Sequence, residues 1–182
     1  MGKNIPMKPF FIALMTALLC TTGISATEEE TRATPTTGRE ATAPGRPGFA
    51  QVSDNDPQMD RAVENAQKTL AFFMAAVRAK KDGDTAFEIK KGFVDGGKVE
   101  HLWVKVASFD GKNFHGKIDN QPIDVNNAHS GQRVTVTPQD VDDWMFLKDG
   151  KLIGAYTTRV LYARLSPEEK AKYDKQAEFK IQ

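Results

Sequence analysis

Two side chains that can transfer protons lie next to each other in the segment VEHLWVKV, residues 99–106, where Glu100 precedes His101 and Trp103 follows. A carboxylate and an imidazole can act as a general acid and base or bind a metal ion. A tryptophan beside them can hold the apolar face of a ligand. The segment alternates as a β-strand does, and adjacent strand residues point to opposite faces. Glu100 and His101 therefore reach one substrate atom only through a β-bulge.

The apolar residues of this strand predict which of its faces is the core side. Leu102 and Val104 share one register, so we expect this register to face the core. His101, Trp103 and Lys105 share the other register and are predicted to point away from it. This second face either forms an exposed binding surface or is covered by another element, such as a long helix, with His101 as a hydrogen-bonded neighbour.

A second concentration of acids and aromatic surface lies in the segment VDDWMF, residues 141–146. Asp142 and Asp143 could form a general acid pair, although consecutive acids on a turn more often cap a helix or remain solvated. Downstream, the segment GAYTTR ends at Arg159, where a last strand is predicted to meet a helical region. The Arg159 guanidinium could clamp a ligand carboxylate or pair with Asp143, and we favour the internal pair.

The sequence predicts no metal ion and no cofactor. No two of the three histidines, His101, His115 and His129, have the two- to four-residue spacing that brings ligands together on one element. The phosphate-binding, dinucleotide-binding, calcium-binding and zinc-protease motifs are all missing from the sequence. The enzyme interpretation therefore depends on Glu100, His101 and Asp143 converging in one cleft.

The N-terminus has the three parts of a secretory signal. Lys3 and Lys8 supply positive charge, an apolar run covers residues 10–20, and Ala26 ends a small-residue cleavage site. The run is too short for a membrane span, which needs roughly 20 residues. We therefore expect residues 1–26 to be removed and the protein to be periplasmic or secreted, with no membrane span after cleavage. A lipid anchor at Cys20 is disfavoured because Leu19 precedes it where a small residue is required.

The segment at residues 27–55 is rich in threonine, alanine, proline and glycine, which predicts a disordered tether. Removal of residues 1–26 takes away two lysines and no acid, so the 25 basic and 24 acidic residues of the whole chain become 23 and 24. A net charge near −1 argues against a nucleic-acid partner, because such proteins normally have an excess of basic residues on one face.

The rest of the chain, residues 56–182, is predicted to be one α+β domain. A helix is expected from Asp56-Pro57 to Gly83, with apolar residues at spacings of three and four. Six short strands with tight turns follow between residues 85 and 156 and suggest a small curved antiparallel sheet or half-open barrel. A C-terminal helix is expected after Ser166, where the pattern Ser-Pro-Glu-Glu forms a capping box.

An ordered set of short motifs resembles the YegJ-like bacterial family, domain of unknown function 2314. The motifs are FEIK at 87–90, EHLWV at 100–104, FHGKI at 114–118, Asn120, Pro122, Gly131, DW at 143–144 and GAYTTRVL at 154–161. This resemblance implies a compact α+β domain and supplies no activity. The site positions that it favours are Lys90, Glu100, His101, Trp103, Asp143, Trp144, Thr157 and Arg159.

The leading hypothesis is a non-enzymatic binding or interaction domain of the cell envelope with an unknown protein or peptide partner. Its binding patch would contain His101, Trp103, Trp144 and Arg159, and an immunity or inhibitor protein is one form that it could take. The alternatives are an envelope hydrolase or metal-assisted enzyme that uses Glu100, His101 and Asp143, and a structural envelope protein.

Overall fold

A computed structural model describes residues 38–41, 49–53, 55–177 and 179–181. The expected leader, residues 1–26, lies outside the described residues, so its removal stays a prediction. Within the described ranges, no helix has the length and apolar character that a membrane span requires.

The predicted N-terminal helix is α1, Pro57–Ala79. Asp56 caps it by accepting hydrogen bonds from the backbone amides of Gln58 and Met59, and Pro57 occupies the first position, where no amide is needed. The helix ends at Lys80, which adopts the left-handed conformation, three residues before the predicted Gly83. Its apolar face is buried through Met59, Ala62, Ala66, Leu70, Phe73 and Val77.

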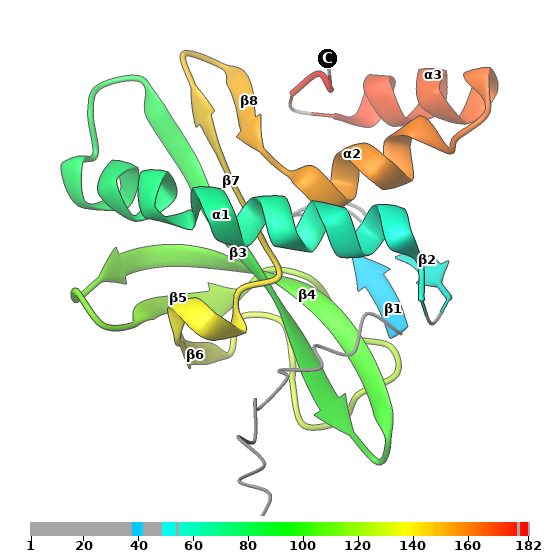
Figure 1. The fold of residues 1–182 in the computed structure, drawn as a ribbon, viewed down its shortest axis with the longest axis horizontal. Helices are drawn as coiled ribbons and strands as arrows, with labels where there is room; N and C mark the ends of the chain where they lie inside the picture. Colours follow the sequence, from blue (N-terminus) through cyan, green and yellow to red (C-terminus); the bar gives the residue numbers. More distant parts are fainter. Residues whose placement is uncertain (1–37, 42–48, 54, 178, 182) are drawn as a thin grey trace, which may run out of the picture. The chain divides into compact units, whose positions relative to one another are not determined.

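One sheet contains all the described strands (Figure 1). The strands are β1 Gly38–Ala41, β2 Phe49–Val52, β3 Asp84–Asp95, β4 Lys98–Phe109, β5 Phe114–Ile118, β6 Arg133–Val136, β7 Asp143–Lys148 and β8 Lys151–Gly154. Their order is β2-β1-β4-β3-β7-β8, with β5 paired to β4 and β6 paired to β5. The pairs are antiparallel except for β1 and β4, which run parallel. Among these strands β2, β6 and β8 are left as edges, so the sheet is not a closed barrel, and the predicted α+β class is confirmed.

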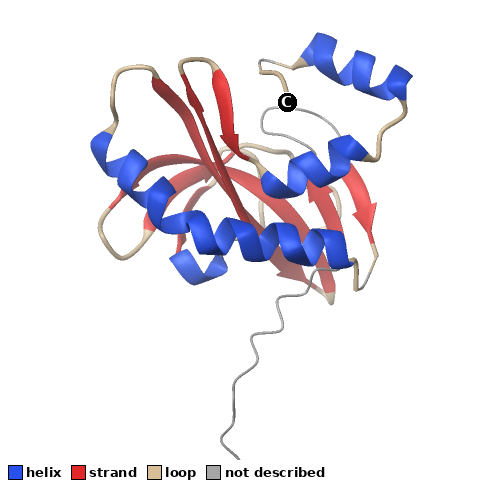
Figure 2. Cartoon of the chain, turned by 45° about the horizontal axis from the view of Figure 1, so that its top comes forward, coloured by secondary structure: helices blue, strands red, loops and turns tan. Residues whose placement is uncertain are grey.

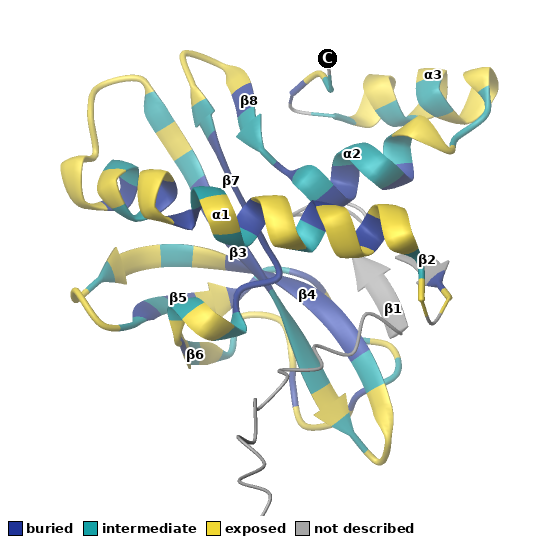
Figure 3. Cartoon of the chain, viewed as in Figure 1, coloured by how far each residue is buried: buried dark blue, intermediate teal, exposed yellow. Residues whose placement is uncertain are grey.

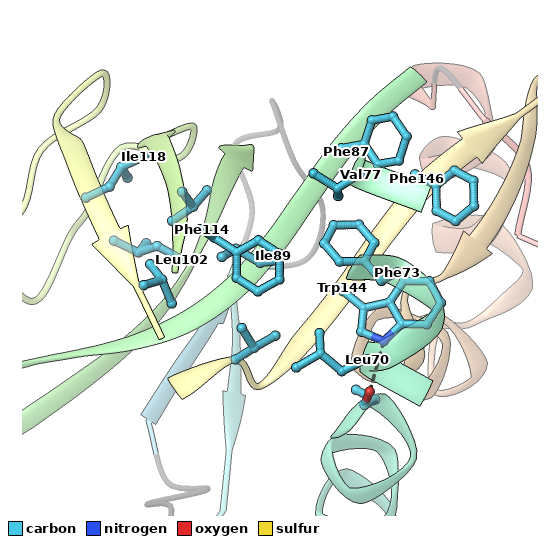
Figure 4. Close-up of a cluster of buried hydrophobic side chains, with 14 of the residues drawn as sticks. Leu70, Phe73, Val77, Phe87, Ile89, Leu102, Phe114, Ile118, Trp144 and Phe146 are labelled. Carbon is cyan, nitrogen blue, oxygen red and sulfur yellow. Dashed lines mark hydrogen bonds between the residues drawn. The ribbon is translucent and has the colours of Figure 1, made fainter. Parts of the chain in front are cut away.

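The main core lies between α1 and one face of the sheet (Figure 4). Phe73 of α1 stacks on Trp144 of β7 at a ring-centroid distance of 5.2 Å, and Phe87 stacks on Phe146 at 5.1 Å. The Trp144 indole N–H donates to the Ala66 carbonyl in α1 at 2.9 Å. Figure 3 shows the buried stripe of α1 facing the sheet and its exposed residues facing outward. The predicted amphipathic helix therefore packs as its sequence pattern indicates.

A second apolar cluster lies on the opposite face of the sheet. Trp103, Met145, Leu152, Ala155 and Phe179 form it, and Leu147, Tyr173 and Ile181 pack against it. Its cover therefore comes from the end of the chain, where α2, Tyr156–Ala163, and α3, Pro167–Gln176, follow the last strand (Figure 2). The Ser166 side chain and Glu169 form the predicted capping box at the start of α3.

Part of the segment that was predicted to be a disordered tether is in the sheet. Strands β1 and β2 pair with each other, and β1 also pairs with β4 through Arg39–Glu100 and Glu40–His101. The prediction of disorder is wrong for these two strands. The physical reason is that backbone hydrogen bonds hold both strands, β1 between β2 and β4 and β2 at the edge, and these bonds need no run of apolar side chains. The remainder of residues 27–55 lies outside the described ranges, apart from Ser53 and Asn55.

Candidate functional site

Three neighbouring strands bring predicted site residues together on the second face of the sheet. Lys90 of β3 lies opposite Trp103 of β4 on one side and opposite Asp143 of β7 on the other. Thr157, in the first turn of α2, completes the group that we call the buried lysine cluster: Lys90, Trp103, Asp143 and Thr157. All four residues are 0% exposed. All four residues are among the predicted site positions, and the structure shows the covered alternative for this face of β4.

Hydrogen bonds connect the polar members of the buried lysine cluster. The Lys90 ammonium donates to the Thr157 hydroxyl at 2.8 Å, and that hydroxyl donates to the Asp143 carboxylate at 2.6 Å. The Lys90 Nζ also lies 4.9 Å from the centroid of the Trp103 ring, within the range of a cation–π contact. The lysine charge is therefore balanced inside the protein by a carboxylate, a hydroxyl and an aromatic ring.

Asp143 also caps helix α2 from a neighbouring strand. Its carboxylate accepts hydrogen bonds from the backbone amides of Tyr156 at 3.1 Å and Thr157 at 2.8 Å. Ala155, at the N-cap position, has no side chain that could do this, and it adopts a left-handed backbone conformation. Asp143 thus takes the role that a serine or aspartate at the N-cap usually has.

Opposing effects act on the pKa of the Asp143 carboxyl. Desolvation by burial raises this pKa above its ordinary value, while the Lys90 ammonium and the hydrogen bonds from Thr157 and Trp144 lower it; the net direction is upward. The donors that contact the two oxygens are two backbone amides of α2, the Trp144 amide and the Thr157 hydroxyl. Each of them needs an acceptor, so this arrangement suits the ionised carboxylate.

The favoured ion pair between Arg159 and Asp143 is wrong. Arg159 instead donates from Nε to the Gly154 carbonyl at 2.8 Å and from Nη2 to the Leu152 carbonyl at 3.1 Å. These contacts fix the junction between β8 and α2, where the chain turns from strand to helix. Lys90 is the cation that faces Asp143, because the two residues are directly paired across β3 and β7.

Glu100 lies on the other face of the sheet and holds a loop. Its carboxylate accepts hydrogen bonds from the backbone amides of Ile123, Asp124 and Val125 at distances of 2.9 to 3.2 Å. Its side chain is 0% exposed. A carboxylate that receives three amide donors is stabilised by charge-assisted hydrogen bonds. Glu100 therefore fixes the backbone of residues 123–125.

His101 pairs with Asp142 and not with Glu100. The His101 Nδ1 lies 2.8 Å from Asp142 Oδ2, and both side chains are almost completely buried. Asp142 precedes β7, and its backbone amide donates to the carbonyl of Lys90 in β3 at 2.8 Å. The pair therefore links the start of β7 to β4.

The exposed aromatic patch that the sequence suggested is not present. Strand parity is confirmed, because Leu102 and Val104 lie in the core under α1 and Trp103 lies in the second cluster. However, Trp103 is 0% exposed and Trp144 is 1% exposed. The residues that cover Trp103 come from the C-terminal segment, not from the long helix, and Trp144 belongs to the core that α1 covers.

The three groups of the enzyme hypothesis engage separate partners. Glu100 binds the loop on the α1 side, whereas His101 and Asp143 bind their own partners on the opposite side of the sheet. General acid–base chemistry requires the reacting proton within hydrogen-bond reach of each group. Within the described ranges, no group of three or more histidine, cysteine, aspartate or glutamate side chains is arranged to hold a metal ion.

The accessible polar residues that sequence reasoning missed lie on the outer face of β4, β5 and β6. Lys105 pairs with Lys117, and Lys117 pairs with Arg133, so three cations lie directly opposite one another across three strands. We call Lys105, Lys117 and Arg133 the cationic row. All three are exposed, and a hollow of about 410 Å³ adjoins Lys117 and Arg133. The row depends on strand register, which no short motif reveals.

Comparisons with known proteins place the domain in a bacterial context. A family model described as "Uncharacterized protein conserved in bacteria (DUF2314)" matches residues 56–181. The uncharacterized protein YegJ of Escherichia coli strain K12 is 34% identical over 129 residues, which cover 67% of this chain and 83% of that protein. A putative ankyrin repeat protein of Neisseria meningitidis serogroup B is 30% identical over 131 residues, which are 68% of this chain but only 52% of that protein. No solved structure matches the chain significantly.

Proposed function

Because the chain belongs to the bacterial family DUF2314, whose description states no activity, we propose a function from its own residues: an exported domain that binds a partner in the cell envelope and catalyses no reaction. The partner is a protein or peptide, and a secreted toxin or enzyme that the domain blocks is one form of it. The proposed location is the periplasm or the extracellular space.

The observation that carries the non-enzymatic part is the internal use of the titratable side chains. Lys90, Glu100 and Asp143 are 0% exposed, and each binds another part of the same chain. A catalytic group must touch its substrate, and an active site is normally an open cleft that admits one. These side chains meet the requirements of structural residues: they cap a helix, fix a loop and balance a buried charge.

Accessible surface remains for a partner on the outer face of β4, β5 and β6. This face carries the cationic row and the adjoining hollow. Charged rows on an exposed sheet steer the encounter with an oppositely charged partner and set its orientation. Trp103 lies two positions before Lys105 on the same face of β4, so the buried lysine cluster helps to hold this part of the strand in place.

The proposal of export rests on the leader pattern at residues 1–26, with Lys3 and Lys8 before the apolar run and Ala26 at its end. Its test is cell fractionation with mass measurement of the recovered protein. A chain that lacks residues 1–26 and accumulates in the periplasmic fraction is the expected result. A full-length protein in the cytoplasmic fraction would exclude export.

The binding part is tested by cross-linking in intact cells, followed by reconstitution with the purified partner. We expect a complex that forms with wild type and is lost in the double variant Lys117→Glu and Arg133→Glu. The matched control is the double variant Lys172→Glu and Lys175→Glu on α3, which has the same charge change at two exposed positions. Equal binding by both variants would remove this face from the site, and turnover of the partner by wild type would contradict a non-enzymatic role.

A further inference from the structure

The pairing of the cationic row is unfavourable for the fold on its own. Residues that lie directly opposite each other in an antiparallel pair have Cβ atoms about 5 Å apart, and like charges at this distance destabilise the pair. Lys105–Lys117 and Lys117–Arg133 are two such pairs in succession. Lys117, in the middle, is next to a cation on both sides.

Negative groups near the row balance it only in part. Lys105 donates to Asp119 at 3.3 Å, and Asp110 is engaged with His115 at 2.7 Å. Among the described residues, neither Lys117 nor Arg133 has a carboxylate within ion-pair distance. The positive charge is thus concentrated at the β5–β6 end of the row.

The hollow adjoins this end of the row. Its walls are Ala107, His115, Gly116, Lys117, Arg133, Val134 and Thr135. The register shifts between Val106 and Ser108, which makes Ala107 an extra residue in β4 beside the hollow. A Cβ atom at Gly116 would lie 2.4 Å from the Lys105 carbonyl oxygen, so only glycine fits between these strands.

Hydrogen-bonding side chains lie beside the charges. The Thr135 hydroxyl and the His115 Nδ1 are 3.3 Å apart, and both residues line the hollow. A guanidinium offers a planar pair of donors that matches two oxygens of one tetrahedral anion, and an ammonium adds a point charge. The hollow thus combines the guanidinium of Arg133, the ammonium of Lys117 and the hydroxyl of Thr135.

We propose that this hollow binds a phosphate group, with Arg133 and Lys117 as the charged contacts and Thr135 as a hydroxyl contact. The inference goes beyond the proposed function, because it adds a phosphate ligand to the face that is proposed to bind the protein or peptide partner. A phosphate monoester has close to two negative charges at neutral pH, whereas a carboxylate ligand has one. The monoester therefore better matches the charges of Lys117 and Arg133, which have no carboxylate partner in the part of the chain that the structure describes. The hollow, about 410 Å³, is within the range of small-molecule sites.

The phosphate can belong to a soluble molecule or to a lipid headgroup, and the test separates these two sources. The protein, purified from the cell fraction in which it accumulates, is titrated with inorganic phosphate and pyrophosphate by calorimetry. It is also sedimented with phosphatidylcholine vesicles that contain either phosphatidic acid, a phosphate monoester, or phosphatidylglycerol, a phosphate diester. Amide chemical shifts of Gly116 and Val134 report whether the ligand occupies the hollow.

We expect saturable binding of pyrophosphate or of phosphatidic acid vesicles, and the arm that responds identifies the source. Arg133→Gln and Lys117→Gln should each weaken it by about tenfold, as expected for a lost charge-assisted hydrogen bond. The matched control Lys172→Gln on α3 should change it less than about twofold. All three positions are exposed, so the variants should fold as wild type does.

Two results would overturn the inference. One is the failure of wild type to bind phosphate, pyrophosphate or phosphatidic acid vesicles at concentrations up to about 10 mM. The other is unchanged affinity in Arg133→Gln and Lys117→Gln. If phosphate binding fails while the cross-linked partner still binds in reconstitution, the proposed function stands and only the ligand class is wrong.

Discussion

A lysine ammonium without solvent exposure needs its compensation inside the protein. Lys90 obtains it from Thr157, Trp103 and the Asp143 carboxylate. The removal of one member of a buried ion pair leaves the other charge desolvated and uncompensated, which costs more than the pair contributes in net stability. Lys90 and Asp143 are therefore energetically coupled.

The substitution Lys90→Met removes the ammonium and keeps most of the side-chain volume. We expect it to lower the free energy of unfolding by about 3 kcal/mol, because the Asp143 carboxylate would remain buried without its cation. Urea denaturation followed by circular dichroism measures this loss.

The double variant Lys90→Met with Asp143→Asn is the control for charge. An asparagine keeps one oxygen for the α2 amides and removes the buried charge, so the double variant should be more stable than the sum of the two single losses predicts. Additive losses would show that the ammonium and the carboxylate are not coupled.

The sequence predicted these residues by type and motif order, but not their surroundings. Alternation placed Trp103 on the second face correctly, since parity is a property of the strand alone. The cover over Trp103 comes from Phe179, which is 76 positions away and follows a helix of low hydrophobicity. Burial depends on such long-range packing, and for that reason the expected exposed patch was wrong.

Two helix ends are joined by one ion pair. Asp56, the N-cap of α1, contacts the guanidinium of Arg164, the C-cap residue of α2, at 2.6 Å. The hydrogen bond from Arg164 is the largest effect that lowers the pKa of Asp56 to about 2. The ordinary pKa of this carboxyl is 3.8, so between these two values the unfolded chain binds more protons than the folded one.

The sign of this linkage gives a pH prediction. The stability from Asp56 is fully present above about pH 4 and is lost as the pH falls through its folded pKa of about 2. Urea denaturation between these pH values should show a smaller loss of stability in Asp56→Asn than in wild type, since asparagine can still cap α1. Equal losses would mean that Asp56 does not contribute to acid unfolding.

The end of the chain contributes Phe179 to the second apolar cluster, around Trp103. Phe179 is 8% exposed in the cluster around Trp103, whereas Phe72 of α1 is 55% exposed. The substitution Phe179→Ala should lower the free energy of unfolding by about 3 kcal/mol, because it leaves a cavity beside Trp103.

The matched variant Phe72→Ala removes the same atoms from an exposed position and should cost less than about 1 kcal/mol. Thermal and urea unfolding of both variants test the difference. Similar losses would show that the C-terminal segment does not cover the sheet in solution.

Secondary structure was the best predicted level. The capping signals at Asp56 and Ser166 act locally, and both caps are confirmed. The strands β1 and β2 were missed because their composition is that of a linker, and pairing through backbone hydrogen bonds does not require a pattern of apolar side chains. The Asp143 cap of α2 was missed for another reason, since the cap and the helix belong to different elements.

The distribution of charge over the whole molecule gives a further prediction. The expected mature chain is close to neutral, so the cationic row is a local feature and not a result of overall charge. The substitution Lys117→Gln should raise the free energy of unfolding by about 0.5 kcal/mol at low salt, because it relieves repulsion from both neighbours. The gain should decrease as salt screens the charges.

Lys172→Gln should leave stability unchanged at both salt concentrations, since α3 has no comparable row. If Lys117→Gln is more stable than wild type but loses pyrophosphate binding, the cationic row is retained for its ligand and not for stability. A loss of stability in Lys117→Gln would contradict the expected repulsion.

The fold class could be predicted from the order of helices and strands in the sequence. The cationic row could not, because it depends on the register between strands, which composition does not specify.

The parallel addition of β1 to β4 also determines where the domain opens first. Two register positions hold β1 to the rest of the sheet, whereas the β3–β4 hairpin is held along eight. Local opening requires least free energy where fewest contacts are broken. In hydrogen–deuterium exchange, the amides of β1 and β2 should therefore exchange well before those of β3. Release of this edge would free the β4 backbone at Glu100 and His101 to pair with a strand from another chain.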